Sequence, residues 1–280
     1  MDTLIQKPKL RNVNVQRATH QGEPVFLIQD GLRLTDATIV LPQVLGPLAM
    51  LCDGNHTLPE MQATLEVQFG LRLSESIIQN LVEQFDHALL LDSQRFYQTR
   101  AQVVQEYRAS PFRMPALAGS SYPADADTLR ARLRDYLDKT KAQTSPVAAT
   151  SRGVISPHID YLRGGHVYAQ VWASAAAAIR EAELVIVLGT DHNANLGTLT
   201  LTSQNYASPL GVMPTEREIV NKLAGILGPD QAFADELHHR GEHSIELVLI
   251  WLQFLRDEKP VPVVPILTGS FFHFMSGQVD

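Results

Sequence analysis

Three histidines of this sequence stand where side chains from separate segments can meet at a metal ion. His158 follows the short apolar run 153–156, and His192 follows the apolar run 184–189. His243 precedes a strongly apolar segment. A neutral imidazole nitrogen is a good metal ligand at neutral pH. If the two runs are neighbouring strands, His158 and His192 project into one crevice, and His243 is a third candidate for it.

A simpler interpretation of these histidines stays open at this stage. A single histidine at the end of a strand is more often a surface residue or a hydrogen-bonded one than a metal ligand. Two histidines at equivalent strand ends, both flanked by turn formers, are harder to explain in that way. His238 and His239 are predicted to lie near a surface turn and are given no role.

The segments around the three histidines alternate between strand and helix patterns. After a first core strand at 153–156, uninterrupted apolar runs at 184–189 and 261–268 are typical of strands covered on both faces. Residues 166–182 and 242–257 are predicted to be helices. The order predicts a three-layer α/β/α domain. Ligands of such sheets bind beyond the carboxyl ends of the strands, where two of the histidines are placed.

The composition restricts the class of protein. Of the 280 residues, 45% are apolar and 19% are charged, and the net charge is −7. This balance supports a real core and argues against binding of nucleic acid or anionic membranes, which requires clustered Lys and Arg. The start lacks the apolar segment of a secretory signal, so we expect a cytoplasmic protein. Cys52, the single cysteine, is expected to be a buried thiol.

The region before residue 106 has a different texture and no catalytic cluster. Two short strands are expected at 24–30 and 32–41, followed by three helices and a closing strand at 89–97. Thr57 and Glu60 form the capping box of the second helix. The apolar face of the third helix is predicted to consist of these residues: Ile77, Leu81, Val82 and Phe85.

This arrangement is similar to a winged-helix module. Residues 51–70 (LCDGNHTLPEMQATLEVQFG) and 77–91 (IIQNLVEQFDHALLL) resemble the PqqD-like domains, which dock a leader peptide along an exposed strand. A small extension packed against the main domain is the other interpretation, and a DNA-binding winged helix is disfavoured because no helix is basic. We expect a small α+β domain at 1–105, a linker at 106–117 and an α/β domain at 118–280.

Six ordered blocks of the second region resemble the Memo family, known in prokaryotes as AmmeMemoRadiSam system protein B. The blocks are AGSSYP (118–123), SPHIDYLRGG (156–165), VLGTDHN (187–193), SPLG (208–211), EHSIE (242–246) and VPILTGSF (264–271). The resemblance implies a fold akin to class III extradiol dioxygenases, which hold non-haem iron. It implies that His158 and His192 contact the metal, and that Glu242 and His243 line the cavity as catalytic residues.

The sequence departs from the family pattern in three places. The family's P-H-A-G-Y reads Pro157-His158-Ile159-Asp160-Tyr161, so Asp160 is either an added ligand, a partner of a histidine, or a solvent-facing carboxylate. Asp191 stands directly before His192. Family members also continue with a Ser-Ser-Asp-x-x-His block and a later cysteine. Two histidines alone make a weak metal site, so we expect a fragment, an altered gene model, or a chain completed by a partner.

Two functions are therefore expected. The first is a metal-dependent, dioxygenase-like oxidoreductase that acts on an unknown small molecule or peptide, with iron as the first choice of divalent metal and copper or zinc as alternatives. The second is a non-catalytic peptide-binding or scaffold protein of a radical-SAM modification system. Nucleic acid and membranes are not expected partners, and a homo-oligomer is left open.

Overall fold

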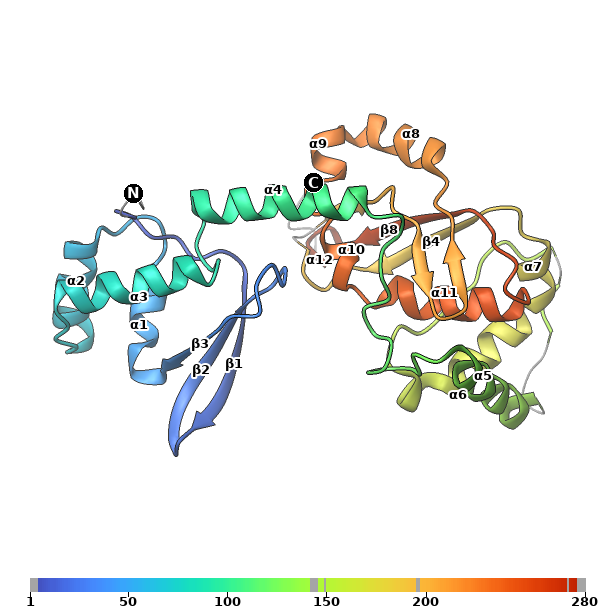
Figure 1. The fold of residues 1–280 in the computed structure, drawn as a ribbon, viewed down its shortest axis with the longest axis horizontal. Helices are drawn as coiled ribbons and strands as arrows, with labels where there is room; N and C mark the ends of the chain where they lie inside the picture. Colours follow the sequence, from blue (N-terminus) through green and yellow to red (C-terminus); the bar gives the residue numbers. More distant parts are fainter. Residues whose placement is uncertain (1–4, 142–145, 149, 195–196, 271, 276–280) are drawn as a thin grey trace. The chain divides into compact units, whose positions relative to one another are not determined.

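The computed structural model forms two compact units. It describes residues 5–141, 146–148, 150–194, 197–270 and 272–275 (Figure 1). The units are Met1–Glu106 and Tyr107–Asp280, and the division falls within helix α4 (Gln94–Ala109). Within the described residues, no helix combines the length and the apolar character needed to cross a lipid bilayer.

The N-terminal unit begins with an antiparallel sheet of order β1-β2-β3. The strands are β1 (Val13–His20), β2 (Glu23–Asp30) and β3 (Thr38–Pro42). Gln21 and Gly22 join the first two strands with φ angles of 53° and 87°. Two consecutive positive φ angles match the twist of a tight hairpin, and glycine adopts them without strain.

Helices follow the sheet in the N-terminal unit. They are the 3-10 helix η1 (Gln43–Leu45), α1 (Gly46–Leu51), α2 (Leu58–Phe69), α3 (Glu75–His87) and α4. The predicted capping box of α2 is confirmed, since Thr57 Oγ1 accepts from the backbone N–H of Glu60 and Glu60 accepts from the backbone N–H of Thr57. Cys52 is buried as predicted, and burial raises the pKa of its thiol to about 12.

Three local predictions for this unit are wrong. The strand predicted at 32–41 forms only near its end, as β3. The apolar run Leu89–Leu91 is buried but does not lead into a strand, because Ser93 Oγ accepts from the N–H of Phe96 and starts α4 there. The sheet therefore precedes the helices, and no closing strand is present at 89–97. On α3, Ile78 is buried in place of Ile77, which is exposed.

The C-terminal unit is built on a three-stranded sheet of order β4-β8-β5. Strands β4 (Val185–Thr190) and β8 (Val263–Thr268) are parallel, and the short β5 (Leu199–Leu201) is antiparallel to β8. Both apolar runs predicted as strands are thus confirmed. The expected cover on both faces is found for β8 but not for β4, where Ile186 and Leu188 are exposed. A separate ribbon joins β6 (Tyr206–Ser208) and β7 (Gly211–Met213).

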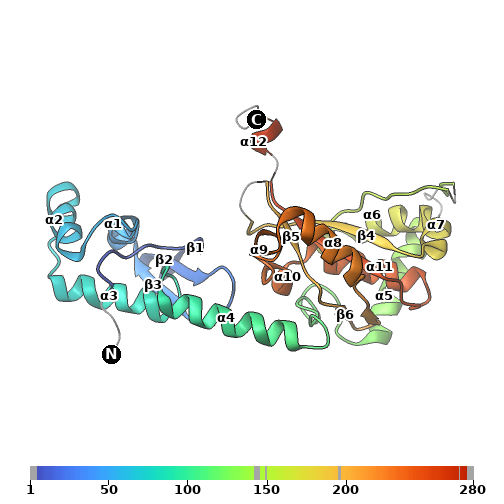
Figure 2. The ribbon, with the colours of Figure 1, turned by 90° about the horizontal axis from the view of Figure 1, so that it is seen from above.

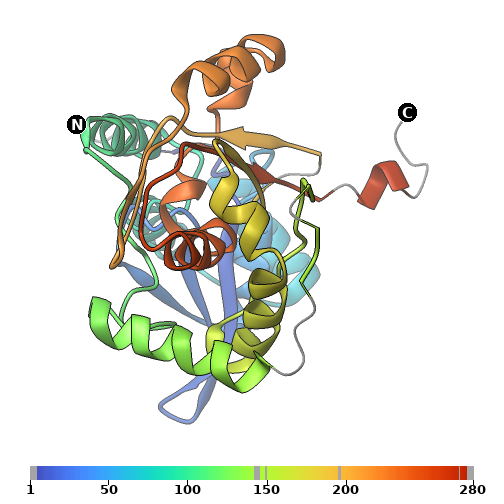
Figure 3. The same ribbon diagram turned by 90° about the vertical axis from the view of Figure 1, so that its right-hand side faces the viewer.

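Helices cover both faces of this sheet, so the predicted α/β layering is observed. On one face α11 (Ser244–Leu255) packs against β4 and contacts α5 (Ala126–Thr140), α6 (Tyr161–Ser174) and α7 (Ala176–Glu181). On the other face α8 (Arg217–Leu227) and α9 (Pro229–Ala232), drawn in orange in Figure 3, cover β8 and β5. Two further short helices are α10 (His238–Gly241) and α12 (Phe272–Met275).

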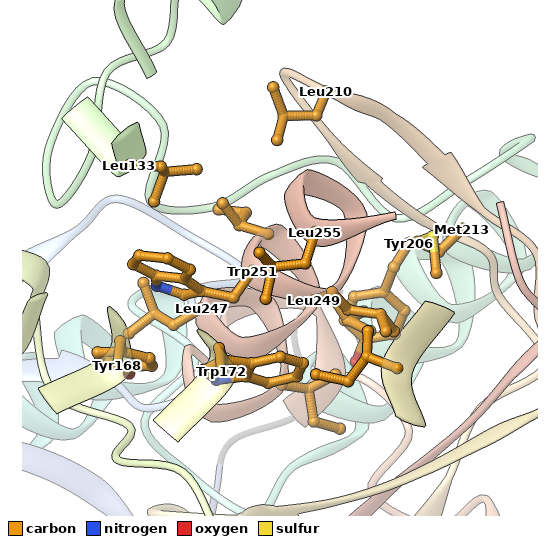
Figure 4. Packing of buried hydrophobic residues seen from close by; sticks show 14 of the residues in the cluster. Leu133, Tyr168, Trp172, Tyr206, Leu210, Met213, Leu247, Leu249, Trp251 and Leu255 are labelled. Carbon is orange, nitrogen blue, oxygen red and sulfur yellow. The ribbon is translucent and has the colours of Figure 1, made fainter. Parts of the chain in front are cut away.

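Helix α11 forms the centre of the larger core. Trp251 is fully buried and stacks on Tyr168 with a ring-centroid distance of 6.3 Å (Figure 4). Tyr161 donates its hydroxyl to the Leu247 carbonyl at 2.5 Å. Burial of one large apolar side chain contributes about 1.5–3 kcal/mol. The cluster therefore fixes α11 and the start of α6 relative to one another.

The first core strand predicted at 153–156 is absent. These residues carry no strand, and the helix predicted from residue 166 begins earlier, at Tyr161. Asp160 caps that helix by accepting from the N–H of Arg163. Ser156 is held instead by a side-chain bond, in which Trp172 Nε1 donates to Ser156 Oγ at 2.9 Å. An apolar run becomes a strand only when a neighbouring edge pairs with it.

Candidate metal centre

The structure brings together three histidines from three separate elements. His158 precedes α6, His192 follows β4, and His243 precedes α11. One nitrogen of each ring lies within 4.8 Å of the others. The His192 and His243 rings stack with a centroid distance of 4.6 Å, and His158 lies 5.3 Å from His192 and 5.8 Å from His243. Three imidazoles at this spacing can supply the donor set of a transition-metal site.

Glu242 orients two of these rings through their Nδ1 atoms. Its buried carboxylate lies 3.0 Å from Nδ1 of His192 and 3.0 Å from Nδ1 of His243. It also accepts from the backbone N–H groups of His192, His243 and Ser244. A carboxylate on Nδ1 fixes the ring and leaves Nε2 as the nitrogen that faces a metal. Glu242 therefore acts on the histidines and not as a fourth member of their cluster.

The local charges favour a cation at this position. Burial opposes ionisation of Glu242, but hydrogen bonds from His243 and from the His192 and Ser244 backbone outweigh it and lower its pKa. The hydrogen bond to Glu242 in turn raises the pKa of His243. The pKa of His158 is lowered by burial and by the two neighbouring imidazoles. One buried negative charge thus contacts two of the three rings, and the third, His158, is neutral near neutral pH.

A close approach of β4 and α11 positions His192 beside His243. A Cβ placed on Gly189 would lie 2.5 Å from Cγ1 of Ile245 and 2.7 Å from Oγ of Ser244. Ser244 donates its hydroxyl to the Thr190 carbonyl at 2.8 Å. Only glycine permits this contact without displacement. Gly189, the glycine of the G-T-D-H segment, therefore allows β4 and α11 to lie close enough for His192 and His243 to stack.

Asp160 and Asp191 take structural roles. Besides capping α6, Asp160 pairs with Arg163 at 2.5 Å, and it is not a member of the histidine cluster. Asp191 lies 2.7 Å from Nδ1 of His238, and both side chains are buried. The prediction that His238 and His239 lie near the surface is wrong. The His239 ring is fully buried between the Tyr206 hydroxyl, at 2.6 Å, and the Thr200 carbonyl, at 2.9 Å.

A buried ion pair, missed from the sequence, braces the segment that carries Glu242. Arg113 pairs with Glu246 in the first turn of α11 and donates to the carbonyls of His239, at 2.7 Å, and Glu242, at 2.9 Å. Glu246 also accepts from Tyr122 and from two backbone N–H groups. Arg113 and Glu246 are 133 positions apart, so no local pattern links them.

The region built on these contacts is the part of the chain that matches a family model. Residues 113–273 match the family described as Memo-like protein, which is more than half of the chain and includes the three histidines and Glu242. The chain belongs to the Memo-like protein family. The resemblance read from the six sequence blocks is thereby confirmed.

Several curated relatives carry the family name. A "MEMO1 family protein" of Aquifex aeolicus is 25% identical over 263 residues, which is 94% of this chain and 66% of that protein. A Methanosarcina barkeri protein is 29% identical over 157 residues, 56% of this chain and 54% of its own length. This chain therefore spans about half the length of the archaeal relative. The Aquifex alignment is longer than the Memo-like region, so it includes residues of the N-terminal unit.

A groove adjoins the histidines in the Memo-like unit. It has a volume of about 1050 Å³ and runs between β4 and residues 151–156. His158, Thr190 and Ser244 line it together, at the carboxyl end of β4. The His192 and His243 side chains are 43% and 36% exposed. The histidine cluster is thus open to solvent on one side, as a site that admits a further ligand must be.

Proposed function

We propose that His158, His192 and His243 hold one divalent metal ion and that the protein is a metal-dependent oxidoreductase related to the extradiol dioxygenases. The observation that carries the proposal is the meeting of three imidazole nitrogens within 4.8 Å of one another, from three elements. Iron is the metal that the family resemblance implies. Copper and zinc are alternatives, because imidazole suits all three.

The chain's own residues account for binding and orientation at such a site. Glu242 holds the Nδ1 atoms of His192 and His243, so their Nε2 atoms share one direction. When bound, the metal supplies Lewis acidity and, if it is iron or copper, redox chemistry. The solvent-exposed side of the cluster is where a substrate would bind. His243 carries a proton readily because of Glu242, so it is also the acid–base candidate when it is not a ligand.

Metal analysis of the full chain, purified without a metal-binding tag, tests this proposal. We expect about one equivalent of iron, copper or zinc per chain. His158→Ala removes one of three ligands and should release most of that metal, whereas His20→Ala, in β1, should retain it. Wild type without stoichiometric metal, or an unchanged content in His158→Ala, would contradict the proposal.

A second candidate is peptide binding by the N-terminal unit, as the PqqD resemblance implies. Supporting it, β3 pairs only with β2 among the described residues, so its other edge is open, and Val40 on this strand is exposed. An open edge of an antiparallel sheet accepts an extended peptide as an added strand. Titration of leader peptides from radical-SAM systems into the full chain tests it, with Val40→Pro as the variant that blocks pairing. Absence of binding would remove this candidate.

A further inference from the structure

The groove beside the histidines has a strand edge as one wall. Among the described residues, β4 pairs with β8 on one side and with no strand on the other. Residues 151–156 form the opposite wall without pairing to β4. In Figure 2 the chain leading into α6 runs past β4 as a thin ribbon. The groove therefore separates two extended segments of the same domain.

The free edge of β4 carries unpaired backbone groups. Val185 donates its N–H to Pro262 and Asp191 donates to Thr268, so the odd-numbered residues of β4 face β8. In a parallel pair the N–H and C=O of one residue point to the same side, and consecutive residues alternate. The backbone groups of Ile186 and Leu188 consequently point into the groove. An occupant that supplies hydrogen bonds would satisfy them.

The side chains at this edge are apolar and uncovered. Ile186 and Leu188 are 57% and 70% exposed, although their neighbours Val264 and Ile266 on the same face of the sheet are buried beneath α8 and α9. Ile155 on the opposite wall is 95% exposed. Edge strands in monomers are usually protected by charge, proline or a covering segment. None of these protects β4 in the described structure.

We propose that the groove binds an extended segment of a partner polypeptide, which pairs with β4 as an added β-strand and reaches the histidine cluster with one end. The six residues of β4 span about 20 Å, so the partner strand has a similar length. Its alternate side chains are apolar where they meet Ile186, Leu188 and Ile155. Glu181 and Glu183 outnumber Arg152 among the charged residues of the lining, and both precede Val185 at the start of β4. A basic residue is therefore favoured at the other end of the partner strand, away from the histidines.

Two other occupants fit the groove less well. In a second copy of the chain, β4 is flanked by residues 151–156 as well. That segment would meet the groove wall before the β4 strands of the two copies could pair. A fatty acyl chain would cover Ile186 and Leu188 but leave their N–H and C=O groups buried without partners, which is unfavourable. A single extended polypeptide satisfies both the apolar side chains and the backbone.

Selection from a random heptapeptide library displayed on phage, with the full chain as bait, tests the proposal. We expect enriched peptides that alternate apolar residues and carry Lys or Arg near one end. A synthetic copy of the best peptide should bind at least tenfold more weakly after N-methylation of alternate amides, which removes its backbone donors. Leu188→Lys should weaken binding by a similar factor. Ile226→Lys, at an exposed apolar position of α8, should have no effect.

Hydrogen exchange locates the bound peptide. The amides of Ile186 and Leu188 should become protected on binding, while the amide of Val187, which faces β8, should stay unchanged. Absence of enriched peptides, equal binding of the N-methylated form, or protection elsewhere would overturn the proposal. Binding should persist in EDTA, so a failure of the metal proposal leaves this result unaffected.

Discussion

Two clusters of polar side chains lie at the start of α11. They differ in how many of their polar atoms have hydrogen-bond partners within the protein. Arg113 and Glu246 are buried, and every contact described for them goes to another part of the protein. The three histidines are partly open to solvent, and Glu242 holds two of them from one side only. Three residues along the chain separate Glu242 from Glu246.

The difference indicates that the two clusters, although close in sequence, have different roles. Removing one partner of a buried ion pair strongly destabilises the fold. Such a pair leaves no donor or acceptor atom available to bind a ligand. An open set of imidazoles with one side fixed contributes less to folding and keeps nitrogen lone pairs available. Stability should therefore depend on the Arg113–Glu246 cluster and metal affinity on the histidine cluster.

The largest expected effect is on the closed cluster. Arg113→Ala leaves the Glu246 carboxylate buried without its ion-pair partner and should lower the free energy of unfolding by about 3–5 kcal/mol. Urea denaturation followed by circular dichroism measures this, with Lys222→Ala, at an exposed position of α8, as the control. A decrease in the free energy of unfolding of less than about 1 kcal/mol, as for surface ion pairs, would show that Arg113 and Glu246 do not form a buried ion pair.

The close approach of β4 to α11 gives the next effect. Gly189→Ala places a methyl group against Ile245 and Ser244, so β4 and α11 must separate, at a cost of about 1–3 kcal/mol. Metal affinity should fall as well, because His192 moves away from His243. Gly225→Ala in α8 meets no atom within 4 Å and should be neutral or slightly stabilising. Equal behaviour of the two variants would contradict the tight approach.

Local patterns predicted the elements that carry the site but not all of their partners. The apolar runs of β4 and β8, the helix α11 and the capping box at Thr57 follow from short-range rules. The ends of β4 and α11 place His192 and His243, whereas His158 lies before α6 and not after the expected strand. The strand expected at 153–156 needed a pairing edge that the local pattern does not reveal. The pairs Arg113–Glu246 and Asp191–His238 join residues far apart in sequence, so their burial was not predictable from spacing.

Within the open cluster, Glu242→Gln should affect metal binding more than folding. The amide no longer supplies the negative charge that orients two imidazoles, and loss of such a partner typically weakens metal binding by about 10–100-fold. Competition with a chromogenic chelator measures the change in the affinity for zinc. Glu218→Gln, in the first turn of α8, is the matched control. Unchanged affinity in Glu242→Gln would show that the carboxylate does not act through the histidines.

The smallest expected effect is a pH dependence of metal binding. Because Glu242 raises the pKa of His243, the protonated ring stabilises the metal-free fold below the unfolded value of about 6.5, and this contribution is lost as the pH rises through the folded pKa. A metal must displace that proton, so its affinity should fall by about tenfold per pH unit below the folded pKa. Chelator competition between pH 8 and pH 6 measures this. A flat profile would place His243 outside the metal site.

The most direct test of the central claim is an anomalous difference map from crystals of the full chain soaked with zinc. We expect one strong peak at about 2.0–2.1 Å from a nitrogen of each of His158, His192 and His243. Nδ1 of His192 and of His243 should remain on Glu242. A map without a peak among the three rings, or with its main peak at other residues, would contradict the assignment of this cluster as a metal centre.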